Sequence, residues 1–224
     1  MNAPKFIPFN RHAPIRMYRR NLPHWRPDGC TYFVTFRLKD SIPQSLVKAW
    51  RERDRLWCVA HGLDGELTED ELRDRYVAIP AVDRARYEGE RARRLHIELD
   101  KCHGSCLLKL KVNQCQLEAP LMHHHGTRCY VGDYVIMPNH VHWLVCPREG
   151  EELEDILRSV KSYTARRLKG KREGVGAWQR ENYDRIVRDR EELTRIRHYI
   201  GGNPVKAKLK SGAYRCYRCD WLNA

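Results

Sequence analysis

Two histidines separated by a single valine, His140 and His142, are the residues of this chain with the clearest capacity for chemistry. Alternate residues of a β-strand point to the same face, so both imidazoles project together if the run is extended. Neutral imidazole is a common metal ligand, and two rings side by side can share a divalent cation. The pair follows Met137-Pro138-Asn139 in an apolar run, where two ordinary strand histidines are the alternative interpretation.

A sheet must hold this pair, and the alternation of β-branched and aromatic residues predicts three strands: residues 31–38, 129–137 and 140–147. Helical spacing predicts four helices: residues 43–60, residues 107–122 with a break at Pro120, residues 151–169, and a last helix from an N-cap at Asp189 to about Asn203-Pro204. The order strand, helix, strand, strand, helix, helix predicts an α+β fold, an antiparallel sheet with helices on one face.

The domain organisation follows from changes in composition along the chain. Residues 1–26 carry four prolines and six basic residues, and are expected to form a basic N-terminal arm. Residues 27–210 are expected to form a single domain, followed by a C-terminal tail over 211–224. A charged helical stretch near 61–94 interrupts the domain, and we interpret it as an insertion because it has too few apolar residues for a core of its own.

The charge distribution indicates the kind of partner. The formal net charge is +13, and residues 158–218 alone hold 18 basic and six acidic residues. This uneven excess of positive charge predicts that the protein binds a nucleic acid. The alternative is that the basic residues only form a soluble surface. Polar residues interrupt the most apolar stretch, 129–147, so no membrane span is expected. No secretory signal is evident and the nine cysteines are odd in number, so we expect reduced thiols and a cytoplasmic protein.

Four segments resemble a known family. The run YVIMPNHVHWLV resembles the His-hydrophobic-His signature of single-tyrosine transposases, specifically the REP-associated tyrosine transposases of bacteria. Three other segments carry the same resemblance in the family's order: CTYFVTFRLKDSIP, WQRENYDRIVRD and RHYIGGNPVKAKL. The resemblance covers roughly residues 22–48 and 95–210 and leaves residues 61–94 outside.

The resemblance implies a ferredoxin-like (RRM-like) fold with a catalytic C-terminal helix. Family members cut and rejoin single-stranded DNA, here expected at hairpins of palindromic repeats, through a 5′-phosphotyrosine intermediate. It further implies that Tyr199 is the nucleophile and that His140, His142 and Asn203 hold Mg²⁺ or Mn²⁺. A phenol with a pKa near 10 is a poor nucleophile at neutral pH, which is consistent with a need for a cation. No phosphate-binding loop is present in the sequence, so we expect no nucleotide cofactor.

Two other tyrosines are alternative candidates for the nucleophile. Tyr163 follows Val160 at helical spacing, so it is expected to pack in the core, and Tyr183 has no amide residue four positions later. Tyr199 shares a stripe with apolar residues of its helix, so a core role is its alternative. Gly201-Gly202 and the following Pro204 are expected to loosen the alignment of Tyr199 with Asn203.

Basic and aromatic residues near the end of the chain are the candidate contacts to DNA: Arg166, Arg167, Trp178, Arg195, Lys206 and Lys208. The sequence leaves open a monomer or a homodimer, a swapped C-terminal helix, zinc at Cys216 and Cys219, and association with the bacterial nucleoid. Two rival functions also remain. One is a catalytically inactive protein of the same fold that binds single-stranded DNA hairpins, and the other is an RNA-binding domain of the RRM type.

Overall fold

The computed structural model describes residues 5–9, 16–19, 23–26, 29–171 and 176–223, with the backbone alone described for 16–19 and 23–26. The remainder of the expected N-terminal arm lies outside the described residues. The chain divides into two compact units, one made of residues 1–11, 28–41 and 99–224, the other of residues 12–27 and 42–98.

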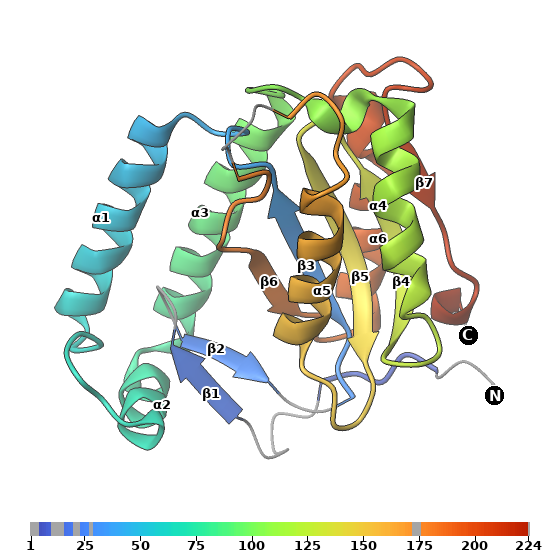
Figure 1. Ribbon diagram of the computed structural model, residues 1–224. Coiled ribbons are helices and arrows are strands. Elements are labelled where there is room, and N and C mark those ends of the chain that lie inside the picture. Colours follow the sequence, from blue (N-terminus) through green and yellow to red (C-terminus); the bar gives the residue numbers. More distant parts are fainter. Residues whose placement is uncertain (1–4, 10–15, 20–22, 27–28, 172–175, 224) are drawn as a thin grey trace. The chain divides into compact units, whose positions relative to one another are not determined.

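A five-stranded antiparallel sheet is the centre of the first unit (Figure 1). Its strands follow the spatial order β6-β3-β5-β4-β7 and are, in chain order, β3 (Tyr32–Arg37), β4 (Cys129–Ile136), β5 (His140–Pro147), β6 (Tyr183–Ile186) and β7 (Arg215–Tyr217). Counted along the chain, β3, β4, β5 and β6 are the first, second, third and fourth strands, and their spatial order in the sheet is therefore 4-1-3-2. Helical segments connect the first strand to the second and the third strand to the fourth. This is the ferredoxin-like arrangement, so the α+β class expected from the sequence is confirmed.

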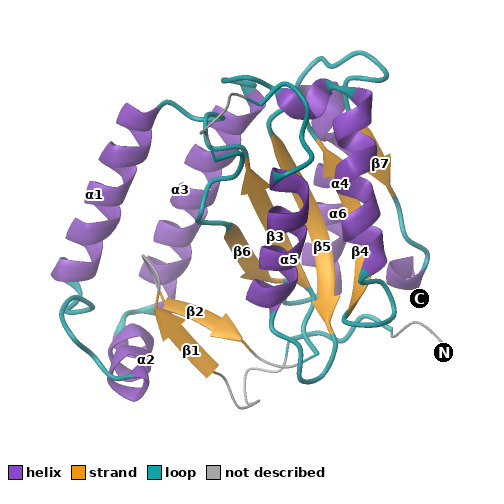
Figure 2. Ribbon diagram, viewed as in Figure 1, coloured by secondary structure: helices purple, strands orange, loops and turns teal. Residues whose placement is uncertain are grey.

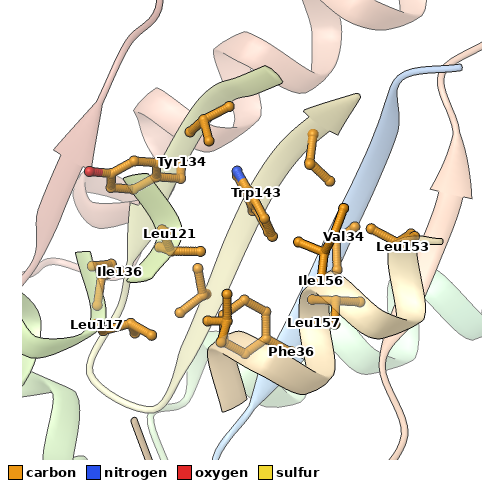
Figure 3. Close-up of a cluster of buried hydrophobic side chains, with 14 of the residues drawn as sticks. Val34, Phe36, Leu117, Leu121, Tyr134, Ile136, Trp143, Leu153, Ile156 and Leu157 are labelled. Atoms are coloured by element: carbon orange, nitrogen blue, oxygen red, sulfur yellow. The ribbon is translucent and has the colours of Figure 1, made fainter. Parts of the chain in front are cut away.

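One face of the sheet is covered by α4 (Lys111–His123) and α5 (Leu153–Ala165), which Figure 2 shows side by side across the strands. The short η1 (Leu107–Lys109) precedes α4. Alternate residues of β3, β4 and β5, among them Phe36, Trp143 and Ile136, meet Leu121 and Ile156 from the two helices in one buried cluster (Figure 3). This core fixes the strands in their register and therefore fixes what points to the opposite face.

The opposite face of the sheet holds α6 (Arg190–Lys206), whose Leu193, Ile196 and Ile200 pack on Phe33 and Leu144. The Asp189 side chain caps the helix by accepting from the Glu192 backbone N–H at 2.7 Å, as expected from the sequence. Short η2 (Trp221–Asn223) packs into the same cluster.

Two predicted helix boundaries are wrong. The helix expected to break at Pro120 continues to His123, and the helix expected to end near Pro204 continues to Lys206. Each proline lies in the last turn, where it removes one intrahelical hydrogen bond and leaves the preceding turns intact. Gly201 and Gly202 are likewise helical, so Tyr199 and Asn203 keep regular helical spacing.

A β-bulge in β4 links the sheet to α6. Val131 pairs with Val145 and Tyr134 pairs with Trp143, so Gly132 and Asp133 together oppose one residue of β5. Asp133 is buried and its carboxylate accepts from Arg197 Nε at 2.8 Å. Arg197 also donates to the Cys219 carbonyl, and Cys219 N–H donates to Asp133, so α6 and the C-terminal residues share this anchor.

The second unit contains the hairpin β1 (Arg16–Arg19) and β2 (Pro23–Arg26) and the helices α1 (Gln44–Ala60), α2 (Glu69–Ala78) and most of α3 (Ala81–Asp100). It has a small buried cluster of its own, formed by Cys58, Leu63, Leu72, Tyr76, Ile79 and Tyr87. This contradicts the expectation that the charged stretch lacks the residues for a core. Within the described ranges, every helix is too short or too polar to cross a bilayer.

Candidate active site

The two histidines of β5 lie on the α6 face of the sheet, and both are fully buried. Their Nε2 atoms are 3.0 Å apart, so both rings direct the same nitrogen to one point, as the alternation of a strand requires. Phe33 from β3 stacks on His142 with ring centroids 5.5 Å apart. The structure therefore brings the pair together in a water-poor setting next to α6.

Each imidazole is oriented through its other nitrogen. His140 Nδ1 lies 2.7 Å from Asn139 Oδ1, and Asn139 Nδ2 donates to the His103 carbonyl, which requires the amide oxygen to face the ring. An amide oxygen only accepts, so His140 carries its proton on Nδ1 and presents the Nε2 lone pair. His142 Nδ1 lies 2.7 Å from Thr35 Oγ1, from the β3 position paired with His142. Such partners fix the ring orientation of metal-binding histidines.

Tyr199 reaches this point from α6, with its hydroxyl 3.1 Å from His142 Nε2. Its ring meets His142 and Phe33 edge to face, so the phenol is held from two sides. Burial raises the pKa of Tyr199, the Asp100 carboxylate raises it further, and the nearby Asn203 amide opposes the shift. The hydroxyl is therefore protonated at neutral pH.

Asn203 lies one turn beyond Tyr199 and is 1% exposed. Neither its amide oxygen nor its amide nitrogen makes a hydrogen bond with the described residues, although both atoms are buried. Unsatisfied buried amides are rare in folded proteins, and each one calls for a specific explanation. Among the described residues, no three His, Cys, Asp or Glu side chains are arranged to hold a metal ion.

The rival tyrosines lie elsewhere. Tyr163 is on α5, on the other face of the sheet from the histidine pair, and it is 39% exposed instead of packed in the core as expected. The Arg167 guanidinium lies 3.7 Å from its ring centroid and covers it. Tyr183 is on β6 and packs partly buried against the α6 cluster.

Trp178, a candidate contact to DNA, also makes structural contacts within the first unit. Its indole N–H donates to Thr164 Oγ1 at 2.9 Å, and its ring contacts Phe36 edge to face. The backbone of Trp178 also bridges to Leu38. These contacts use the polar atom and one face of the ring inside the unit, on the side of α5.

The other expected DNA contacts differ in whether their side chains are engaged in ion pairs within the protein. Arg166 and Lys208 are exposed, at the end of α5 and just after α6. Arg195 is paired with Glu191 on the surface of α6 at 3.4 Å, an exposed pair that constrains it little. Lys206 donates to Asp100 at 2.6 Å, beside Tyr199 and Asn203.

Three residues at the site were not predicted from the sequence: Thr35, Asn139 and Asp100. The position of Asn139 could have indicated its role, because it directly precedes the histidine pair in the Met-Pro-Asn run. Thr35 and Asp100 reach the site through contacts with residues about 100 positions later in the chain. Their local sequence gives no indication of this proximity.

The fold and the site together define a ferredoxin-like domain with a buried histidine pair and a helix-borne tyrosine on one face of its sheet. Residues 108–203 match the model of the family described as "Transposase IS200 like", and this segment contains both histidines, Tyr199 and Asn203. Over this segment the chain is similar to the IS200-like transposases, in agreement with the family resemblance of its sequence.

Two individual proteins are also similar. An uncharacterized protein of Haemophilus influenzae is 25% identical over 116 residues, a match that covers 42% of this chain and 63% of that protein. A solved structure described as "Structure of the REP associates tyrosine transposase bound to a REP hairpin" is 15% identical, with a TM-score of 0.42, and the match covers 84% of this chain and 72% of that one.

Proposed function

We propose that this protein is a metal-dependent transposase that cleaves and rejoins single-stranded DNA at palindromic repeat hairpins through a 5′-phosphotyrosine intermediate. The observation that carries the proposal is the convergence of His140 Nε2, His142 Nε2 and the Tyr199 hydroxyl, each about 3 Å from its neighbour. A phenol that faces two oriented imidazoles fits a nucleophile beside a cation site better than it fits core packing.

The residues present suit Mg²⁺ or Mn²⁺. Two ligands at right angles in an octahedral site, each about 2.1 Å from the ion, stand about 3.0 Å apart. The separation of the two Nε2 atoms, 3.0 Å, matches that spacing. The buried and unpartnered amide of Asn203 supplies an oxygen donor next to Tyr199. The cation would be held by His140, His142 and Asn203, and would supply charge stabilisation to the phosphate.

The other roles in the proposed cleavage and rejoining of the strand belong to side chains of this protein. Tyr199 Oη forms a bond to phosphorus, the bond from phosphorus to the 3′ oxygen breaks, and the phenolic proton leaves as the 3′ oxygen gains one. The same exchange in reverse rejoins the strand, so no nucleotide is consumed. Phe33 and His142 hold the phenol against rotation, which keeps its oxygen near the phosphate position.

Covalent trapping tests the proposal. The full chain is incubated with a single-stranded DNA hairpin and Mn²⁺ and separated under denaturing conditions, where a protein–DNA adduct is expected. A Tyr199→Phe variant should form no adduct while it still binds the hairpin. Absence of an adduct with the unaltered protein, together with retained hairpin binding, would favour the alternative, a catalytically inactive hairpin-binding protein of this fold.

The phosphates of the DNA would be contacted by basic side chains: Arg166, Arg167, Arg195, Lys206 and Lys208. The protein would act in the cytoplasm on the nucleoid. All residues of the proposed site come from one chain, so a monomer would be competent. A homodimer remains compatible with this arrangement, and sedimentation with and without the hairpin distinguishes the two.

A further inference from the structure

The end of α3 brings a carboxylate to the side of α6 that carries Tyr199 and Asn203. Asp100 is the last residue of α3, and its Oδ2 accepts from Lys206 Nζ at 2.6 Å. Lys206 lies seven residues after Tyr199 and three after Asn203, so all three share one side of α6. Asp100 therefore lies along the stripe of α6 that carries the nucleophile, and its charge is close enough to influence Tyr199.

The second oxygen of Asp100 has no hydrogen-bond partner among the described residues. Asp100 Oδ1 is buried and makes no hydrogen bond with the described residues, and the same holds for both amide atoms of Asn203. Buried carboxylate oxygens are almost always hydrogen-bonded, because removing them from water is costly. Both groups are on the side of α6 that carries Tyr199, and both are available to a partner from outside the protein.

The chemistry of a hydrated cation supplies such partners. His140, His142 and Asn203 are three uncharged ligands, so an octahedral Mg²⁺ or Mn²⁺ would keep about three positions for water or phosphate oxygens. Water bound to a divalent cation is a strong hydrogen-bond donor and needs an acceptor. A direct ligand role for Asp100 does not fit, because it forms no metal-binding group with the two histidines among the described residues.

The geometry points to Asp100 as an outer ligand of this cation, which accepts hydrogen bonds from its bound water and so strengthens its binding before DNA arrives. The inference rests on the proposed function, since it deepens the same site. Asp100 is a positioning residue here, because it acts through water and does not touch the reacting phosphate.

A purely structural role is the rival explanation, in which Asp100 only fixes the end of α6 through Lys206. The two roles predict different results at Lys206, whose side chain is 58% exposed. If the ion pair alone matters, loss of Lys206 should harm cation binding as much as loss of the carboxylate. If Asp100 holds the water shell, loss of Lys206 removes a competing positive charge and leaves cation binding intact or tighter.

The test measures binding of Mn²⁺ alone to the full chain, by isothermal titration calorimetry and electron paramagnetic resonance, without DNA. Asp100→Asn should weaken Mn²⁺ binding by about 10-fold or more, the usual effect of losing an outer partner of a metal site. Asp100→Glu should retain most of the affinity, and Lys206→Met should bind at least as tightly as the unaltered protein. Asp155→Asn is the matched control, since it removes the same charge from the Asp155–Arg158 pair on α5.

Equal Mn²⁺ affinity in Asp100→Asn, or an equal loss in Lys206→Met, would overturn the inference and leave the cation site standing. Failure of the unaltered protein to bind Mn²⁺, or unchanged binding in His140→Ala, would overturn the cation site and the inference together. Thermal melting accompanies each variant, and Asp100→Ser replaces Asp100→Asn if the latter does not fold.

Discussion

The Tyr199 hydroxyl lies 3.1 Å from Nε2 of His142, although 57 positions separate the two residues in the chain. The contact exists because β5 directs alternate residues to the α6 face and α6 presents Tyr199 there.

Removal of the phenolic oxygen tests the nucleophile. Tyr199→Phe keeps the ring contacts with Phe33 and His142 and should abolish the covalent DNA adduct while hairpin binding persists. Tyr163→Phe is the control, because Tyr163 is exposed on the other face of the sheet, and it should retain the adduct. Loss of the adduct in the control alone would place the chemistry on α5.

The histidines should behave as one unit in the cleavage of hairpin DNA. His140→Ala or His142→Ala alone should cost nearly as much activity as both changes together, because one imidazole leaves a hard cation too few ligands. Asn203→Ala should be milder and partly rescued by extra Mn²⁺, since water can take the place of an amide oxygen. Cleavage titrated against metal concentration checks this, and full cleavage in EDTA would contradict it.

The buried ion pair under α6 should dominate its stability. Arg197→Met leaves Asp133 buried without its cation and should lower the free energy of unfolding by about 3–5 kcal/mol. Arg195→Met breaks an exposed pair on the same helix and should change it by less than about 1 kcal/mol. Urea denaturation followed by circular dichroism measures both, and similar effects would argue against the anchor.

Alanine substitution should have opposite effects on stability at the two glycines of α6 and at Gly132 of β4. A Cβ at Gly201 or Gly202 meets nothing within 4 Å, so each alanine should stabilise the helix by about 1 kcal/mol. A Cβ at Gly132 would lie 2.8 Å from the Leu144 side chain and carbonyl, so Gly132→Ala should destabilise the fold. Melting temperatures that fall in the first two variants would refute this prediction.

Binding to single-stranded hairpin DNA should weaken steeply with salt. The logarithm of the binding constant should fall by about 0.7 per logarithmic unit of salt for each phosphate contacted on a single strand. Arg166→Ala and Lys208→Ala should each reduce the slope by about that amount, because both side chains are exposed. Fluorescence anisotropy over a salt series measures the slope, and an unchanged slope excludes that residue from the contact.

The sequence predicts the parts of the site that depend on local spacing. His140 with His142, and Tyr199 with Asn203, are related by the periods of a strand and a helix, and their proximity in each element follows from those periods. Thr35 could not be found in this way, because its contact with His142 depends on the register between strands more than 100 residues apart. Asp100 is a similar case, since it lies at the end of a charged helix.

Other errors have equally physical causes. Tyr163 is exposed instead of packed in the core, because helical spacing from Val160 does not by itself decide which residues at the edge of the apolar stripe reach the sheet. The second unit has a core because aromatic residues such as Tyr76 and Tyr87 pack between helices that are otherwise charged. The rings of these tyrosines are buried, and their hydroxyls donate hydrogen bonds to carboxylates of the charged helices.

The shared anchor at Asp133 has a consequence for movement during strand exchange. Arg197 stands two residues before Tyr199, so movement of α6 away from the sheet would break its bonds to Asp133 and to the Cys219 carbonyl together. Such a movement would strand a buried charge at a cost of about 3–5 kcal/mol. In the proposed reaction, this anchor favours a Tyr199 that keeps its position on the sheet while the DNA ends move to it.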